Sequence, residues 1–178
     1  RDQLYAFAIS GLFGTRNSSH EMRLKALVIE LTDMPVICGN ELASSLGAPR
    51  RALTAALNAR MVPPIKELIR SVLKVMDQHK IDAPLMIVKG DGSLASLDNA
   101  IEKPISTVLS GPAASVIGAC QLSGLQNAIV ADMGGTTTDI AIVTNGQPEL
   151  CADGAMIGDW QPMVEAVRVS SIGLGGDS

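Results

Sequence analysis

One short run in the last third of the chain combines glycines, threonines and aspartates, residue types that can bind phosphate together with a metal ion. It reads Asp132-Met133-Gly134-Gly135-Thr136-Thr137-Thr138-Asp139. Glycines lack a Cβ atom, so their backbone N–H groups can approach phosphate oxygens, and threonine hydroxyls add further donors. Carboxylates repel phosphate unless a cation lies between them, and Mg²⁺ commonly uses one or two carboxylates while keeping several waters. We therefore expect a phosphate-binding turn, with Asp132 as the residue that faces the metal.

The residues around this run predict how it is held. Apolar stretches from Ala128 to Asp132 and from Asp139 to Thr144 flank the glycines, which is typical of two strands joined by a tight turn. Asn145-Gly146 favours a two-residue hairpin, so a third strand is expected from Pro148 to Cys151. The prediction is a three-stranded antiparallel meander. A purely structural interpretation stays open, in which the run is a glycine hairpin without a ligand.

The rest of the chain alternates strand and helix patterns, which indicates an α/β fold. Ser18 and Glu21 have the spacing of a capping box, and a helix is expected to follow as far as Thr32-Asp33. Pro63-Pro64 should kink or divide a long helical region. The other expected elements are a strand in 4–12, a strand at 35–38, helical residues from 49 to 76, a strand at 83–88 and a helix from 110.

Composition narrows the class of protein. The chain has 178 residues, of which 47% are hydrophobic and 18% charged, which is enough for one ordinary domain or for two small subdomains that share a core. With a net charge of −4 and only 2% aromatic residues, nucleic acid is not an expected partner. No apolar run is long enough to span a bilayer. The sequence contains no GxxxxGK[ST] pattern, which disfavours a P-loop NTPase.

Other reactive side chains carry weaker predictions. Cys38, Cys120 and Cys151 are far apart and form no CxxC pair, so we expect buried small side chains in a reducing, cytoplasmic setting. The arginines Arg50, Arg51 and Arg60 are expected on a solvated helix face. Surface roles near helix ends are expected for His20 and His79.

The glycine-threonine run, preceded by Ser110-Gly111-Pro112-Ala113-Ala114-Ser115-Val116-Ile117-Gly118-Ala119, resembles the hydantoinase A/5-oxoprolinase family. Further segments with this resemblance are 10–11, 16–17, 20–21, 48–53 and 90–92. The family belongs to the actin-like ATPase superfamily, in which ATP lies between two ribonuclease-H-like lobes. The resemblance therefore implies an internal, partial fragment of that α/β fold. Residues 1–109 would belong to the first lobe, 110–126 to a connecting helix of small residues, and 127–178 to the start of the second lobe.

The same resemblance implies a function and a set of site residues. The parent protein would use ATP and Mg²⁺ to open a cyclic amide or imide, because phosphorylation of the amide oxygen makes the carbonyl carbon electrophilic. A second, hydantoinase B-like subunit is a possible partner. Alternatives are an acetone carboxylase-like subunit and an actin-like or chaperone-like nucleotide switch. The implied metal ligands are Asp132 and Asp139, with Asp132 catalytic; the implied nucleotide-binding residues are Gly134, Gly135, Thr136, Thr137, Gly175 and Gly176.

Overall fold

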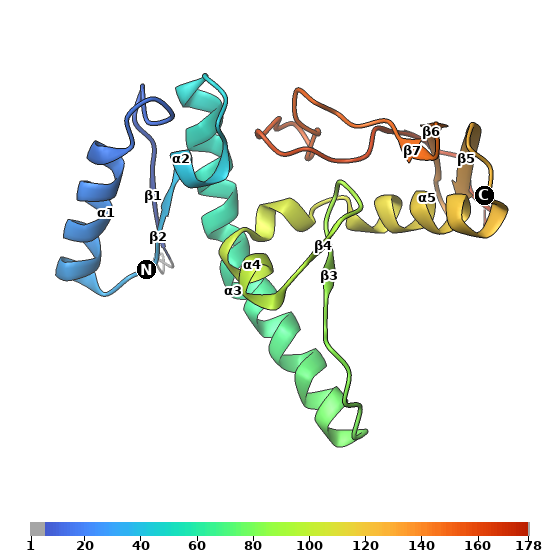
Figure 1. Cartoon of the computed structure of the whole chain (residues 1–178), viewed down its shortest axis with the longest axis horizontal. Coiled ribbons are helices and arrows are strands. Elements are labelled where there is room, and N and C mark those ends of the chain that lie inside the picture. Colours follow the sequence, from blue (N-terminus) through green and yellow to red (C-terminus); the bar gives the residue numbers. More distant parts are fainter. Residues whose placement is uncertain (1–5, 178) are drawn as a thin grey trace.

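The computed structural model describes residues 6–177, and its strands there form three small sheets connected by helices (Figure 1). The helices are α1 Ser19–Thr32, α2 Gly39–Leu42, α3 Ala48–Gln78, α4 Leu97–Glu102, the 3-10 helix η1 Pro104–Thr107, and α5 Ser110–Ser123. The strands are β1 Phe7–Ile9, β2 Val36–Cys38, β3 Ile87–Val88, β4 Leu94–Ala95, β5 Ala128–Met133, β6 Thr138–Thr144, β7 Gln147–Pro148 and β8 Val169–Ile172. None of the helices within residues 6–177 has the length and apolar character needed to cross a membrane.

The first part of the chain is a strand-helix-strand unit whose loop is fixed by a buried carboxylate. Strands β1 and β2 are parallel, with Phe7 opposite Val36, and α1 lies between them in the chain. Glu21 of α1 is only 2% exposed; its carboxylate accepts hydrogen bonds from the N–H groups of Gly11 (2.7 Å) and Asn40 (3.0 Å). The predicted capping box is therefore wrong. Ser18 makes no side-chain cap, and the Glu21 carboxylate instead binds N–H groups of the loop after β1 and of helix α2.

The position of Arg51 also differs from its prediction. We expected it on a solvated helix face, but it is fully buried at 0% exposure. Its guanidinium donates to the carbonyl oxygens of Gly11 (2.7 Å), Leu12 (3.0 Å) and Ser45 (3.0 Å). Buried polar groups are stable when they are hydrogen-bonded. Arg51 and Glu21 thus hold the 11–14 loop from two sides.

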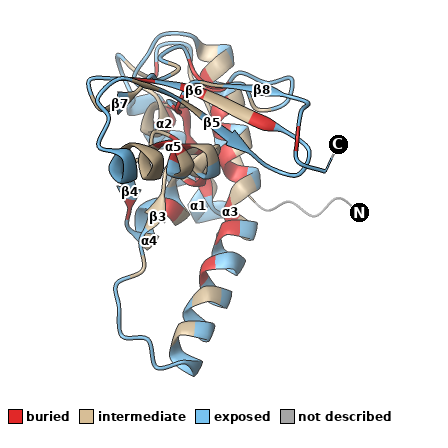
Figure 2. Ribbon diagram, turned by 90° about the vertical axis from the view of Figure 1, so that its right-hand side faces the viewer, coloured by how far each residue is buried: buried red, intermediate tan, exposed pale blue. Residues whose placement is uncertain are grey.

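Helix α3 is a single helix that contains both Pro63 and Pro64, so of the two predicted outcomes, a kink or a division, the division does not occur. Proline lacks an N–H donor, but apolar residues after the prolines keep the helix on its neighbours. Ile65 and Ile69 pack in one buried cluster with Ala95 and Ala100. Beyond this cluster the helix extends away from the rest of the molecule, and its surface there is mostly exposed or half-buried (Figure 2).

The sheet in the last third of the chain confirms the predicted meander and adds a strand. β6 pairs antiparallel with β5, β7 and β8. The third strand is shorter than predicted: β7 covers only Gln147–Pro148, and Leu150 instead forms a bridge to Val167. β8 lies beside β6 from Thr138 to Ala141, a pairing between distant segments that the local pattern did not indicate.

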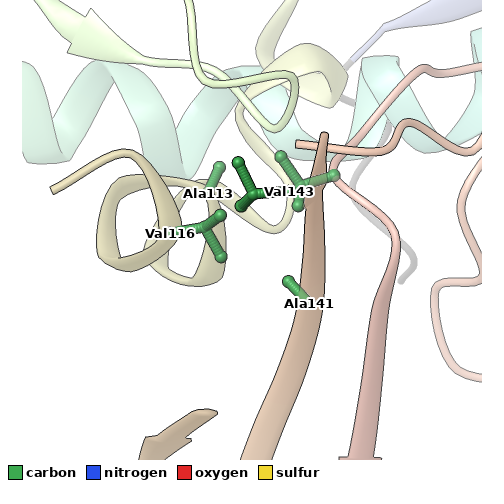
Figure 3. Close-up of a cluster of buried hydrophobic side chains, with 5 residues drawn as sticks. Ala113, Val116, Ala141 and Val143 are labelled. Atoms are coloured by element: carbon green, nitrogen blue, oxygen red, sulfur yellow. The ribbon is translucent and has the colours of Figure 1, made fainter. Parts of the chain in front are cut away.

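One face of this sheet packs on α5. Residues two apart on a strand share a face, so Ala141 and Val143 lie together on β6. They form a buried cluster with Ala113 and Val116 of α5 and with Val167. In Figure 3 the side chains of Ala113 and Val116 on the helix and of Ala141 and Val143 on the strand lie between these two elements. The opposite face carries large exposed side chains, including Ile129 at 74% and Ile142 at 47%.

A glycine loop joins the sheet to the helical part. The N–H of Gly90 donates to the Ser106 carbonyl (2.8 Å), and the N–H of Val167 donates to the Gly90 carbonyl (2.8 Å). A Cβ atom at Gly90 would overlap the carbonyl oxygen of Val108. The preceding strand β3 is shorter than predicted, with only Ile87–Val88 paired.

Candidate functional site

The predicted glycine turn lies at the tip of the β5–β6 hairpin. Strand β5 ends at Met133 and β6 begins at Thr138, and the turn is closed by a hydrogen bond from the N–H of Gly134 to the Thr137 carbonyl (2.8 Å). The residues from Gly134 to Thr137 are all exposed. The hydroxyls of Thr136 and Thr137 and the side of the turn that carries them are thus accessible to a ligand.

A second glycine turn docks against the first. The N–H groups of Gly176 and Asp177 donate to the carbonyls of Gly134 and Gly135, each at 2.9 Å. Gly175 is buried between them; a Cβ atom there would overlap the Gly135 carbonyl oxygen. The structure therefore brings Gly175 and Gly176 together with Gly134 and Gly135, the four glycines for which the resemblance implies nucleotide binding.

The Thr138 hydroxyl fastens the two turns to each other. Its Oγ1 donates to the Leu174 carbonyl (2.6 Å), and the side chain is buried at 4% exposure. Thr138 thus has a structural contact, whereas Thr136 and Thr137 are exposed at the tip.

The two aspartates of the run lie next to each other at the hairpin end of the sheet. Asp132 of β5 is directly opposite Asp139 of β6, and Asp139 is opposite Ser171 of β8. Opposite residues in antiparallel strands share a face. The Ser171 hydroxyl donates to Asp139 Oδ1 at 2.5 Å. Asp132 is exposed, and within residues 6–177 its carboxylate has no protein hydrogen-bond partner. Asp132, Asp139 and Ser171, which we call the carboxylate row, continue the face that packs on α5.

This arrangement fits phosphate and a hydrated magnesium ion. Among the described residues there is no group of three or more His, Cys, Asp or Glu side chains arranged to hold a metal. Mg²⁺ needs fewer, because it commonly takes one or two carboxylates together with waters and phosphate oxygens. Asp132 and Asp139 supply such a pair beside the exposed turn.

The sequence reasoning missed two polar residues at this site. One is Ser171, which orients Asp139. The other is Asp177, whose Oδ2 lies 2.6 Å from the position that a Cβ atom of Gly135 would take. Both come from a distant segment, and only the β6–β8 pairing and the docked turns place them there.

The structure has two cavities of note, and only the smaller one is near the hairpin. The smaller, about 260 Å³, is beside the carboxylate row and is lined by Leu109, Pro112, Asp139, Cys151, Ala155, Met156, Val167, Val169 and Ser171. The larger, about 490 Å³, lies between the α2–α3 region and the 152–165 segment, and none of the hairpin residues lines it. Its wall includes the ion pair Lys89–Asp91 at 3.0 Å. Burial alone would raise the pKa of Asp91, but hydrogen bonds from Ser93 and the charge of Lys89 outweigh it and lower the pKa below its ordinary value.

The histidines and cysteines lie outside the carboxylate row. His20 is exposed in the first turn of α1, and His79 ends α3, as predicted. All three cysteines are free; Cys38 is buried, while Cys120 and Cys151 are half-buried rather than buried as expected. Burial and the negative charges of Glu41 and Glu21 raise the pKa of Cys38 to about 11. Cys38 is therefore a neutral thiol at neutral pH.

The chain is similar in sequence to known lactam-opening enzymes, as their names indicate. Caprolactamase subunit alpha from Pseudomonas jessenii is 31% identical over 180 residues, covering 99% of this chain and 26% of that protein. 5-Oxoprolinase 1 from Arabidopsis thaliana is 34% identical over 129 residues, covering 68% of this chain and 10% of that protein. The chain thus spans at most about a quarter of the length of these relatives.

Two solved structures of related proteins have the same fold as this chain. The crystal structure of the ATP-dependent caprolactamase from Pseudomonas jessenii matches with a TM-score of 0.77 and 29% identity, over 96% of this chain and 25% of that one. The nucleotide-free structure of acetone carboxylase matches with a TM-score of 0.78 and 22% identity, over the same shares, which shows a common fold. Residues 51–178, including the hairpin and the docked glycine turn, match the family described as hydantoinase/oxoprolinase. The resemblance read from the glycine-threonine run is therefore confirmed, and this chain belongs to the hydantoinase/oxoprolinase family.

Proposed function

We propose that this chain is part of a longer ATP-dependent enzyme that opens cyclic amides, and that it contributes one of the enzyme's phosphate-binding loops. The observation that carries the proposal is the pair Asp132 and Asp139, opposite each other beside the exposed glycine turn. In this proposal residues 1–109 belong to a first ribonuclease-H-like lobe, 110–126 connect the lobes, and 127–178 begin the second lobe.

The names of the relatives support a cyclic amide as substrate. A caprolactamase and a 5-oxoprolinase are among them, and both names denote enzymes that act on lactams. One of the matched structures is called an ATP-dependent caprolactamase. A lactam carbonyl is a poor electrophile, and ATP would supply the phosphoryl group that activates it.

The residues of this chain would chiefly position the reacting groups. The N–H group of Gly135 and the hydroxyls of Thr136 and Thr137, all in exposed residues, would bind phosphate oxygens, while Gly134 closes the turn through its own N–H. Asp132 and Asp139 would hold the hydrated Mg²⁺. Gly175 and Gly176 would fix the shape of the turn from behind, since they hydrogen-bond or pack against its carbonyls. Alignment and electrostatic stabilisation are the main protein contributions to phosphoryl transfer.

A carboxylase subunit is the second candidate. Acetophenone carboxylase gamma subunit from Aromatoleum aromaticum is 24% identical over 97% of this chain, and the acetone carboxylase structure shares the fold. Several of the relatives are named as subunits, so a second, hydantoinase B-like subunit is part of the proposal. The identity to caprolactamase is higher, which favours the lactam hydrolase.

The test is a substrate comparison on the longer protein together with its partner subunit. Phosphate release from Mg-ATP would be measured with hydantoin, 5-oxoproline and caprolactam, and separately with acetone and acetophenone plus bicarbonate. We expect phosphate and ring-opened product in equal amounts with at least one cyclic amide. Phosphate release that depends on a ketone and bicarbonate, with a carboxylated product, would support the carboxylase instead.

A further inference from the structure

The small cavity beside the carboxylate row has no role in the function proposed above. Its apolar wall comes from three separate segments: the start of α5, the 151–156 loop, and the chain leading into β8. The apolar residues are Leu109, Pro112, Ala155, Met156, Val167 and Val169. The polar end of the cavity is formed by Asp139 and Ser171, which are hydrogen-bonded to each other.

The cavity lies where one face of the sheet changes from apolar to polar side chains. Along β6, Ala141 and Val143 are buried against α5, and Asp139 is the next residue on the same face toward the hairpin. Val169 and Ser171 make the same apolar-to-polar change on β8, opposite Ala141 and Asp139. A molecule in the cavity would therefore have one apolar side and one side at the carboxylate row.

The position of the cavity argues against a nucleotide base as its natural occupant. Ligand pockets are commonly about 300–1,000 Å³, and this one, at about 260 Å³, suits a small ring. The base of a nucleotide lies a whole sugar away from its phosphates. Asp139, in contrast, belongs both to the cavity wall and to the proposed metal site. The occupant must therefore be a group that reacts with the phosphates or lies next to them.

We propose that this cavity binds the hydrocarbon part of the cyclic amide and turns the amide edge toward Asp139. A small lactam matches the cavity in chemistry, since its methylene groups are apolar and its polar atoms are confined to one edge. This inference rests on the proposed function, and it assigns ring-size selectivity to Ala155 and Val169, which line the wall.

Two substitutions test the cavity in the longer protein with its partner subunit. Ala155 is 3% exposed, so Ala155→Leu fills the cavity, and the KM for the preferred lactam should rise about tenfold or more. Val169→Ala enlarges the cavity, and the ratio of kcat/KM for a seven-membered over a five-membered lactam should rise about tenfold. The affinity for Mg-ATP, measured by calorimetry without lactam, should stay unchanged in both variants. Ile129→Ala, on the exposed opposite face, is the control and should change neither quantity.

The outcomes separate this inference from the proposed function. Wild-type enzyme without any lactam-dependent phosphate release would defeat the proposed function itself. An active wild type with unchanged lactam KM and ring preference in both variants would overturn only the cavity assignment. Weakened Mg-ATP binding with unchanged ring preference would show that the cavity serves the nucleotide. If Ala155→Leu fails to fold, the ring preference of Val169→Ala decides the question.

Discussion

Asp132 and Asp139 lie directly opposite each other on β5 and β6, at the end of the sheet where the glycine turn begins. Two carboxylates on one face of adjacent strands repel each other. Asp139 is held by the Ser171 hydroxyl, whereas Asp132 is exposed and, in the part of the chain described, makes no protein hydrogen bond. The repulsion between the two carboxylates destabilises the folded chain, and a cation bound between them would remove it.

Substituting Asp132 should impair catalysis without impairing folding. In the longer protein, Asp132→Ala is expected to lower ATP turnover and raise the Mg²⁺ concentration needed for half-maximal rate. Mutating a residue that only hydrogen-bonds to a metal ligand commonly lowers activity about 10–100-fold. Because Asp132 would bind the metal itself, we expect its loss to lower turnover by at least that factor. Phosphate release across a Mg²⁺ titration measures this. Asp82→Ala, also exposed and outside the hairpin, is the control. Wild-type turnover in Asp132→Ala would remove this residue from the mechanism.

The docked glycine turns give a matched pair of variants. A Cβ atom at Gly175 would overlap the Gly135 carbonyl oxygen, while one at Gly173 would meet nothing within 4 Å. Gly175→Ala must push the two turns apart, and we expect a loss of about 1–3 kcal/mol in unfolding free energy together with weaker nucleotide binding. Gly173→Ala should leave both unchanged. Urea unfolding and calorimetry with Mg-ATP provide the two measurements, and equal behaviour of the variants would contradict the docked arrangement.

Glu21 offers a test of the first part of the fold. Its carboxylate accepts from the N–H groups of Gly11 and Asn40, and Glu21→Ala would leave both donors without this acceptor. We expect a loss of about 2 kcal/mol or more in unfolding free energy, read from urea unfolding. Glu30→Ala, exposed on the same helix, should change stability very little. Equal stability of the two variants would show that the Glu21 contacts are dispensable.

The hairpin was predictable because its signals are local. Asn145-Gly146 and the apolar stretches around the glycines specify the turns and strand register within about twenty residues of sequence. The pairing of Ala128 with Val143 and of Asp132 with Asp139 follows from that register. Local signals thus predicted two strands with an aspartate on either side of the glycine turn, whereas the shared face of Asp132 and Asp139 is a finding of the structure.

The misinterpreted residues are those whose partners are distant in the chain. Glu21 has capping-box spacing, yet the N–H groups it binds belong to residues 10 and 19 positions away. Arg51 resembles an exposed helix residue, and only the 11–14 loop and Ser45 explain its burial. Ser171 reaches Asp139 through a pairing of β8 with β6 across more than thirty residues. Propensity rules contain no information about such long-range partners.

Because the pKa of the Cys38 thiol is raised, we expect the free energy of unfolding to decrease at alkaline pH. Burial and nearby carboxylates raise the pKa of Cys38 from 9.0 to about 11, so the folded chain retains the proton that an unfolded chain releases earlier. This contribution to stability is complete below pH 9 and is lost as pH rises toward 11. Urea midpoints from pH 8 to 11 should therefore fall more steeply for the wild type than for Cys38→Ala. Parallel slopes in the two proteins would contradict the raised pKa.

The 178-residue chain by itself should hydrolyse little or no ATP and bind nucleotide weakly. In the superfamily that the sequence resembles, phosphates are held between two opposed loops, and this chain contains one glycine-threonine run of that kind. It spans about a quarter of the length of the caprolactamase subunit it matches.

The physical reason is that half a site loses most of its catalytic effect. Groups on both sides of a phosphate are needed to align the attacking atom and to stabilise developing charge. Here the residues from Gly134 to Thr137 are exposed at the hairpin tip, and Asp132 beside them is also exposed. Calorimetry with Mg-ATP and a phosphate-release assay on the purified chain, with Asp132→Ala as the blank, measure the residual function. Micromolar affinity with steady turnover that Asp132→Ala abolishes would mean that a single loop forms a complete site, and the two-lobed arrangement would have to be abandoned.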